Sequence, residues 1–488
     1  MRASGILMPI SALPGPYGIG GLGAQAFAFV DFLKKAGQRY WQILPIGPTG
    51  YGDSPYQSFS AFAANPYFID LALLHADGLL TAGELAAACH DDDACAIQYG
   101  RLFETRFATL GHAVSRFDAN TDAFRAFCEA EGYWLENYAL FMALKEEQGM
   151  VSFALWPEAL RRRDASAMFA ARERLAPRTH FWRVVQYLFF VQWKKLKAYA
   201  NENGVAIIGD IPIYVSPDSA ELWAEGELFQ TGPDGLPAEV AGCPPDAFSA
   251  DGQLWGNPLY AWEYHQSTGY AWWLRRMRHA ASVYDIVRID HFRGFESYYA
   301  IPATQPTAVH GTWRKGPGED FVRAMQAGLP GIRIIAEDLG YLTDAVRSLL
   351  AMSGYPGMKV LQFAFDSREE SDYLPHNYIT NSVVYTGTHD NTTTEDWQLS
   401  APQDDVAFAR RYLDAPAGSL TPRFVRAALA SVADTAIIPI ADWFSLGKFA
   451  RINTPSTVGG NWVWRAAQSA FSDAIAAEIR AKTRLYGR

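Results

Sequence analysis

Eight short apolar runs recur along the chain, and sequence with helical periodicity lies between several of them, as at 24–37, 321–328 and 343–354. Apolar residues occupy both faces of each run, which is typical of parallel strands covered by helices. Eight such strands predict an α/β protein, a closed (β/α)8 barrel of the TIM type, more than an open sheet. The runs are GILMPI (5–10), RYWQILPI (39–46), GVAIIGDIPI (204–213), DIVRIDHF (285–292), IRIIAEDLG (332–340), MKVLQFAF (358–365), SVVYTGTHD (382–390) and DTAIIPIADW (434–443).

Two long intervals interrupt this alternation. Residues 50–185 follow the second run and hold a loop rich in Gly, Pro and Tyr, then charged helical sequence. Residues 214–265 follow the third run and are rich in Pro, Gly, Asp and Trp. We expect a single barrel over 1–488 that carries a mostly helical inserted subdomain at 50–185 and a loop-rich one at 214–265. Because both follow a strand, a barrel places them over its C-terminal face, where active sites lie.

The composition excludes several classes of protein. Hydrophobic residues make up 49% of the chain and charged residues 19%, so we expect a large core and no extensive disorder. The net charge of −10 argues against nucleic acids and anionic membrane surfaces as partners. The apolar N-terminal stretch is cut short at Pro9, and the sequence has no run of ~18 apolar residues, so neither a signal peptide nor a membrane span is expected.

The four cysteines, Cys89, Cys95, Cys128 and Cys243, include no C-x-x-C pair. That pattern favours reduced thiols and a cytoplasmic location over a disulfide framework or a zinc site. Aromatic residues reach 14%, with 15 Trp and 24 Tyr. We assign most of them to the core, while a groove that stacks on sugar rings is the functional alternative.

A literal G-x-G-x-x-G motif occurs at Gly18, Gly20 and Gly23. A dinucleotide-binding loop leaves its strand directly, and an acidic residue further along binds the ribose. Here SALPGPY separates the strand from the first glycine, and the run at 39–46 ends without an acidic residue. We therefore interpret the glycines as a barrel loop, and a dehydrogenase remains a distant alternative.

Four carboxylates stand at or near the ends of four predicted strands: Asp210, Asp290, Glu337 and Asp390. An acidic residue after an apolar strand is costly to bury, so it is paired, catalytic or exposed at the barrel mouth. Four of them at the same end of one barrel indicate a site. Because no His/Asp cluster has ligand spacing, a metal site is the weaker interpretation.

Strand alternation separates the expected roles of these carboxylates. Arg288 and Asp290 are two positions apart and face the same way, so the guanidinium is expected to lower the pKa of Asp290 and keep it ionised as a nucleophile. Glu337 follows apolar residues, which would raise its pKa and suit a general acid. Adjacent strands lie ~4.8 Å apart, close to the ~5–5.5 Å between carboxyls in retaining glycoside chemistry. The pattern predicts a double-displacement glycosidase-type site.

The other polar residues at the strand ends admit two interpretations each. Asp390 is the third acid, expected to grip sugar hydroxyls and favour ring distortion. His389 either assists it or forms a local hydrogen bond at the strand end. Asp210 either belongs to the site or is an interior partner of Arg288.

At these residues the chain resembles a known family. VRIDHFRG, IIAEDLG, TGTHDN and GDIPIYV resemble the four short blocks of the α-amylase clan. The segments 51–71, 242–260 and 453–462 narrow the resemblance to glycoside hydrolase family 77, the amylomaltases (4-α-glucanotransferases or disproportionating enzymes). The resemblance extends from about residue 3 to the C-terminus.

The resemblance implies a role for each of nine residues. Asp290 would be the nucleophile, Glu337 the acid/base and Asp390 the transition-state stabiliser. The substrate-binding residues would be Tyr56, Asp210, Trp255, Arg288, Asp366 and His389. Taken without the family, Tyr56 would more often anchor its loop and Trp255 would pack beneath its own.

The resemblance also implies that residues 242–256 form a loop that arches over the groove and shields the intermediate. Cys243 departs from the aliphatic residue expected before Pro-Pro-Asp. The implied enzyme is a cytoplasmic transferase of α-1,4-glucan segments, without cofactor or metal. Maltooligosaccharides and α-glucans derived from starch or glycogen would be donors, with another glucan or glucose as acceptor. A maltodextrin α-1,4-hydrolase on the same barrel and a catalytically silent glucan-binding protein are the alternatives.

Overall fold

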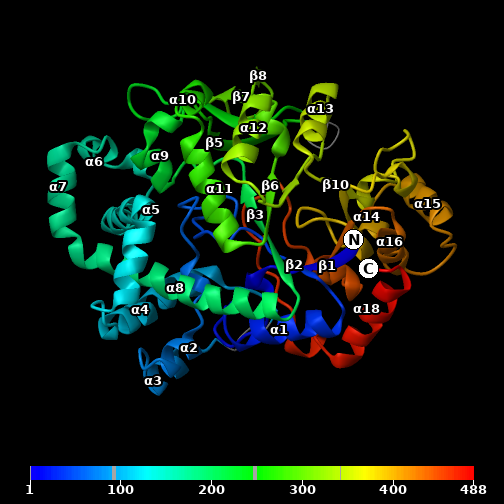
Figure 1. Cartoon of the computed structure of the whole chain (residues 1–488), viewed down its shortest axis with the longest axis horizontal. Helices are drawn as coiled ribbons and strands as arrows, with labels where there is room; N and C mark the ends of the chain where they lie inside the picture. Colours follow the sequence, from blue (N-terminus) through cyan, green and yellow to red (C-terminus); the bar gives the residue numbers. More distant parts are fainter. Residues whose placement is uncertain (1, 91–94, 246–249, 341) are drawn as a thin grey trace.

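The computed structural model describes residues 2–90, 95–245, 250–340 and 342–488, and at its centre eight parallel strands form a barrel (Figure 1). Their order around the sheet is β10-β11-β12-β1-β2-β3-β6-β9. At the remaining seam, the amide of Ala336 donates to the carbonyl of Pro356 at 3.0 Å, so the barrel is nearly closed. Each strand overlaps one of the eight predicted runs: β1 (Ala3–Leu7), β2 (Tyr40–Gln42), β3 (Ala206–Pro212), β6 (Ile286–Asp290), β9 (Ile334–Ala336), β10 (Gly357–Val360), β11 (Ser382–Tyr385) and β12 (Thr435–Pro439).

Helices pack around the barrel, and amphipathic helices bury their apolar face against the strands or against one another. In α1 (Ala24–Lys35), buried Phe29 packs edge-on against Trp41 of β2 with ring centroids 5.0 Å apart. α11 (Ala271–Val283) contacts β3 and β6, and α16 (Thr421–Ala430) and α17 (Ile440–Trp443) contact β12. The remaining helices after β6 are α12 (Gly318–Gly328), α13 (Asp344–Ser353), α14 (Thr394–Ser400), α15 (Gln403–Tyr412) and α18 (Asp473–Leu485), and α18 packs against α1.

The interval 50–185 opens with a loop and continues as helices grouped on one side of the barrel (Figure 1). These are α2 (Leu71–Ala76), α3 (Ala82–Ala87), α4 (Tyr99–Arg116), α5 (Asp122–Glu147), α6 (Glu158–Arg161) and α7 (Ala165–Arg174). The long helix α8 (Ala176–Glu202) packs against α5 and also contacts α1 and β3. The expected boundary at residue 185 falls inside α8, so the insertion and the barrel share one continuous helix.

A second sheet, of four antiparallel strands in the order β5-β4-β7-β8, was not predicted from the sequence. Two strands come from the interval 214–265, β4 (Glu239–Cys243) and β5 (Gln253–Pro258), together with the helices α9 (Ala220–Ala224) and α10 (Trp262–Ser267). The other two, β7 (Ser297–Pro302) and β8 (Thr312–Lys315), follow β6. Residues 246–249 of the expected shielding loop, and 91–94 of the first insertion, lie outside the described residues.

The glycine-rich segment forms the loop between β1 and α1, and Gly23 immediately precedes the helix. A Cβ atom on Gly20 would lie 1.9 Å from the carbonyl oxygen of Ile10, and one on Gly23 would lie 1.9 Å from Oδ2 of Asp70. Close packing therefore accounts for both glycines. A carboxylate at the start of the helix is also unfavourable for a pyrophosphate. Within the part of the chain that the structure describes, no helix is both long and apolar enough to cross a bilayer.

Candidate active site

Arg288 lies within β6, 2% exposed, and holds two of the predicted carboxylates. Its Nη1 atom donates to Oδ2 of Asp210 at 2.6 Å and to Oδ1 of Asp290 at 3.0 Å. Asp210 and Arg288 are register partners on β3 and β6, while Asp290 is the last residue of β6. Asp210 is fully buried, and the interpretation of this residue as an interior partner of Arg288 agrees with these contacts.

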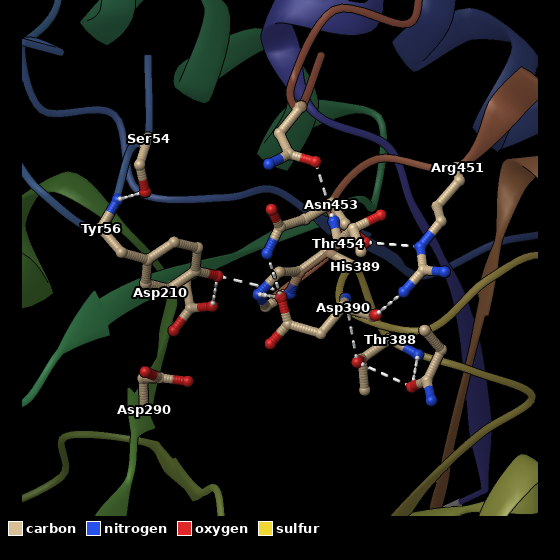
Figure 2. Close-up of polar contacts among 12 residues, drawn as sticks. Ser54, Tyr56, Asp210, Asp290, Thr388, His389, Asp390, Arg451, Asn453 and Thr454 are labelled. Atoms are coloured by element: carbon tan, nitrogen blue, oxygen red, sulfur yellow. Dashed lines mark hydrogen bonds and ion pairs between the residues drawn. The ribbon is translucent and has the colours of Figure 1, made fainter. Parts of the chain in front are cut away.

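Tyr56 comes from the loop that begins the first insertion and reaches the strand ends (Figure 2). Its hydroxyl donates to Oδ2 of Asp210 at 2.7 Å. Burial, and next the charge of Asp210, raise the pKa of Tyr56 well above its ordinary value, so the hydroxyl remains a donor. The phenol ring is stacked on the imidazole of His389, with centroids 4.9 Å apart and planes inclined by 15°. The structure thus brings Tyr56, Asp210, Arg288 and His389 into one connected group.

Glu337 directly follows β9 and faces the residues after β6. Its Oε2 atom accepts the amide of His291 at 2.6 Å, and its Oε1 atom accepts the amide of Leu339 at 2.7 Å. Burial raises the pKa of Glu337 to about 8, and the negative charge of Asp290 contributes in the same direction. Arg288 and the two amides oppose that rise in pKa without cancelling it. Glu337 is therefore protonated at neutral pH, as a general acid must be.

The pKa of Asp290 differs from the value expected from the sequence, which was a lowered one. Arg288 does lower the pKa of Asp290, but burial has the larger effect and raises that pKa to about 6. The side chain is 28% exposed, so it remains open to the barrel mouth. The pKa of Asp290 still lies below that of Glu337, so near neutral pH one carboxyl is charged while the other carries a proton. That division is the one a retaining mechanism requires.

These pKa values predict a bell-shaped dependence of kcat/KM on pH. Activity rises as Asp290 ionises near pH 6 and falls as Glu337 loses its proton near pH 8, because one group acts as the anion and the other as the acid. Initial rates with maltotriose across this range, with stability checked at each pH, measure both limbs. A rate that continues to rise well above pH 8 would contradict the assignment of Glu337 as the acid.

Asp390 lies beyond β11, and its side chain is 47% exposed. Nε2 of His389 is 3.5 Å from its Oδ1 atom. The Nδ2 atom of Asn453 donates to the same oxygen at 2.6 Å, and Arg451 Nη2 donates to the backbone carbonyl of Asp390 at 3.1 Å (Figure 2). Asn453 and Arg451 were not among the predicted site residues. The only signal for Asn453 was its position at the start of the segment 453–462.

Of the two remaining candidates, Trp255 lies beside the site and Asp366 pairs with a residue outside it. Trp255 on β5 packs edge-on against His291, with centroids 4.8 Å apart, and so lies beside the backbone that binds Glu337. His291 has a left-handed backbone (φ 58°), and burial lowers the pKa of its ring to about 3, so the ring is neutral. Asp366 instead pairs with Arg368 at 2.6 Å, with no described contact to the other eight candidates. The guanidinium lowers the pKa of Asp366 to about 2.

Several polar side chains gather at the barrel mouth, but they are not arranged as ligands. Within the described residues, no three His, Cys, Asp or Glu side chains are grouped so that they could hold a metal ion. The two carboxyls lie on neighbouring strands beside an arginine and differ in protonation. The charged one can attack a glycosidic carbon, and the protonated one can give its proton to the leaving group.

Comparison with known proteins points to the same chemistry. A family model described as 4-alpha-glucanotransferase matches residues 8–469. The 4-alpha-glucanotransferase of Streptococcus pneumoniae serotype 4 is 47% identical over 492 residues, covering 100% of this chain and 97% of that protein. That of Thermus thermophilus is 46% identical, and the match covers 98% of both proteins. The amylomaltase of Streptococcus agalactiae, solved in complex with acarbose, matches with a TM-score of 0.97 at 40% identity, covering 100% of both chains.

Proposed function

The chain belongs to the 4-alpha-glucanotransferase family, and on that premise we propose that Asp290, Glu337 and Asp390 carry out the transfer of α-1,4-glucan segments by a retaining double displacement. The observation that carries the assignment is the pair of carboxyls at the ends of β6 and β9. Ile289 and Ala336 are register partners, so Asp290 and Glu337 follow them at the same level of adjacent strands, which lie ~4.8 Å apart.

In the first step, a carboxylate oxygen of Asp290 attacks the anomeric carbon of the donor while Glu337 gives its proton to the glycosidic oxygen. The carbon–oxygen bond of the glucan breaks, the shortened glucan leaves, and an ester to Asp290 forms. In the second step, Glu337 takes the proton from the 4-hydroxyl of an acceptor, whose oxygen attacks the same carbon and releases Asp290. Two inversions preserve the α configuration, and no further reactant is required.

We assign supporting roles to the remaining candidates from their contacts. Arg288 holds Asp290 and Asp210 in place, while Tyr56 and His389 form a stacked pair beside the sugar site. Trp255 would contact the acceptor, because it packs beside the backbone that binds the acid/base Glu337. Asp366 would first have to leave Arg368 to bind a sugar.

The proposed substrates are maltooligosaccharides and α-glucans derived from starch or glycogen, with glucose among the acceptors. The relatives support α-glucans as a class: their names specify 4-alpha-glucan transfer, and one amylomaltase was solved with acarbose. The alternatives are a maltodextrin hydrolase, which would form different products, and a silent glucan-binding protein, which would form none. The cytoplasmic location stays a prediction.

Maltotriose as sole substrate distinguishes these possibilities. We expect glucose together with maltopentaose and longer chains, with a constant number of reducing ends, because each glycosyl unit is passed to another sugar. Separation of products by length, combined with a reducing-end assay over time, measures both quantities. Glucose and maltose with rising reducing ends would instead indicate a hydrolase, and unchanged maltotriose would indicate a silent binder.

A further inference from the structure

We propose that Asn453 is a positioning residue for Asp390: its amide holds one carboxyl oxygen so that the other is presented to the sugar in the transition state. The proposal rests on the stabilising role assigned to Asp390 under the proposed function. It adds a residue more than sixty positions along the chain from Asp390 to the machinery of transfer.

Asn453 contacts the neighbourhood of Asp390 at two points. Its side-chain Nδ2 donates to Oδ1 of Asp390 at 2.6 Å, and its backbone amide donates to the carbonyl of His389 at 3.1 Å. Arg451 joins the two segments further, because Nη2 donates to the carbonyl of Asp390 at 3.1 Å and Nε to the carbonyl of Asn453 at 2.7 Å. Figure 2 shows these residues side by side, with Asn453 directed at the carboxylate.

Asp390 needs such support because of where it lies. β11 ends at Tyr385, so Asp390 stands on a loop, and its side chain is 47% exposed. The ring nitrogen of His389 is 3.5 Å away, which is long for a charge-assisted hydrogen bond, whereas 2.6 Å to Asn453 is short. A carboxylate held by its neighbours does not have to be ordered during the reaction, and preorganised groups of this kind contribute most to catalysis.

Asn453 is itself held in place. The next amide, that of Thr454, donates to Oδ1 of Asn461 at 2.9 Å, and the side chain of Asn461 donates back to the carbonyl of Thr457 at 3.1 Å. The amide of Trp462 donates to the carbonyl of Ile452 at 2.7 Å, so the base of this loop is closed. Asn461 therefore supports the same loop without contacting a carboxylate, which makes it the matched control.

The amide of Asn453 supplies a donor without adding charge. Asn453→Ala removes that donor. Asn453→Asp keeps the shape of the side chain but places a second carboxylate against Asp390, and the two like charges repel each other. If Asn453 positions Asp390, Asn453→Asp is at least as damaging as Asn453→Ala. We expect kcat to fall about 10- to 100-fold in both, with KM changed far less.

The decisive experiment compares α-glucosyl fluoride with its 2-deoxy and 3-deoxy analogues as donors, in the parent enzyme, Asn453→Ala and Asn461→Ala. Removing a hydroxyl that Asp390 grips should lower kcat/KM of the parent by about 100-fold, because such hydrogen bonds strengthen in the transition state. In Asn453→Ala, removal of the same hydroxyl should lower kcat/KM by less than about tenfold, because the hydrogen bond between Asp390 and that hydroxyl is already impaired. In Asn461→Ala, removal of the hydroxyl should lower kcat/KM as much as it does in the parent enzyme.

Two results would overturn the proposal. One is an equal deoxy penalty in Asn453→Ala and the parent for both hydroxyls. The other is a reduction in Asn461→Ala as large as in Asn453→Ala, which would assign the effect to the order of the loop. Neither result would contradict the proposed function. That function fails only if glucan transfer continues without the assigned catalytic carboxylates.

Discussion

Replacement of Asp290 by Asn is expected to lower kcat for maltotriose by ~10⁴-fold or more, because the variant has no carboxylate to form the glycosyl ester. The fold should survive the change. The amide oxygen of Asn can still accept from Arg288, and Arg288 keeps Asp210 as its buried partner at 2.6 Å. Rates of maltotriose consumption and a thermal unfolding curve measure the two effects separately.

The Asp290→Asn variant should also change the pKa of Glu337. The negative charge of Asp290 is the second largest cause that raises the pKa of Glu337, so Asp290→Asn should move that pKa downward from about 8. Titration of the Glu337 carboxyl followed by infrared or NMR spectroscopy would report the shift. Asp473→Asn, which removes a carboxylate from an exposed ion pair with Lys35, is the control for a loss of charge alone. Near-normal turnover by Asp290→Asn would refute the nucleophile assignment.

Replacement of Glu337 by Gln is expected to lower kcat for maltotriose by ~10²- to 10⁴-fold, the usual contribution of a positioned general acid. It should also cost some stability. The carboxyl accepts one amide on each oxygen, from His291 and from Leu339, and a carboxamide can satisfy only one of them. An unpaired buried donor costs about 1–3 kcal/mol, measurable as a lower midpoint of denaturation.

An activated donor separates the two roles of Glu337. Fluoride leaves without a proton, so α-glucosyl fluoride should still react with Asp290 in the Glu337→Gln variant, and the ester should accumulate because no base activates the acceptor. Mass spectrometry of the intact protein would detect the added glucosyl unit. Normal turnover of maltotriose by this variant would show that another group supplies the proton.

The sequence predicted the barrel because its strands are buried on both faces. Runs such as 5–10 (GILMPI) are apolar at every position, and this pattern can be recognised without knowledge of the neighbouring strands. The pattern predicted where each strand lies but not always where it ends. Asp290 is the last residue of β6, as expected, whereas β11 ends at Tyr385 and leaves Asp390 on the loop that follows. The structure brings Asp210, Arg288 and Asp290 into direct contact.

What the sequence did not predict depends on contacts between distant segments. The second sheet pairs β4 with β7, which are five and six residues long; β4 lies in the interval 214–265, whereas β7 follows β6. The pKa of Asp290 depends on burial by surrounding segments, which outweighs the arginine two positions away. Asn453 shows no local sign of its link to Asp390, because that contact exists only after the chain has folded.

The position of β1 between β2 and β12 has a consequence for biosynthesis. Ala3 pairs with Thr435, so the first strand that is made must await the last strand before its second edge is hydrogen-bonded. At the usual speed of translation this delay is roughly 20 to 90 s. Throughout that time an apolar strand edge is open to pairing with other chains. The yield of soluble enzyme should therefore depend on how well chaperones shield the incomplete barrel until β12 leaves the ribosome.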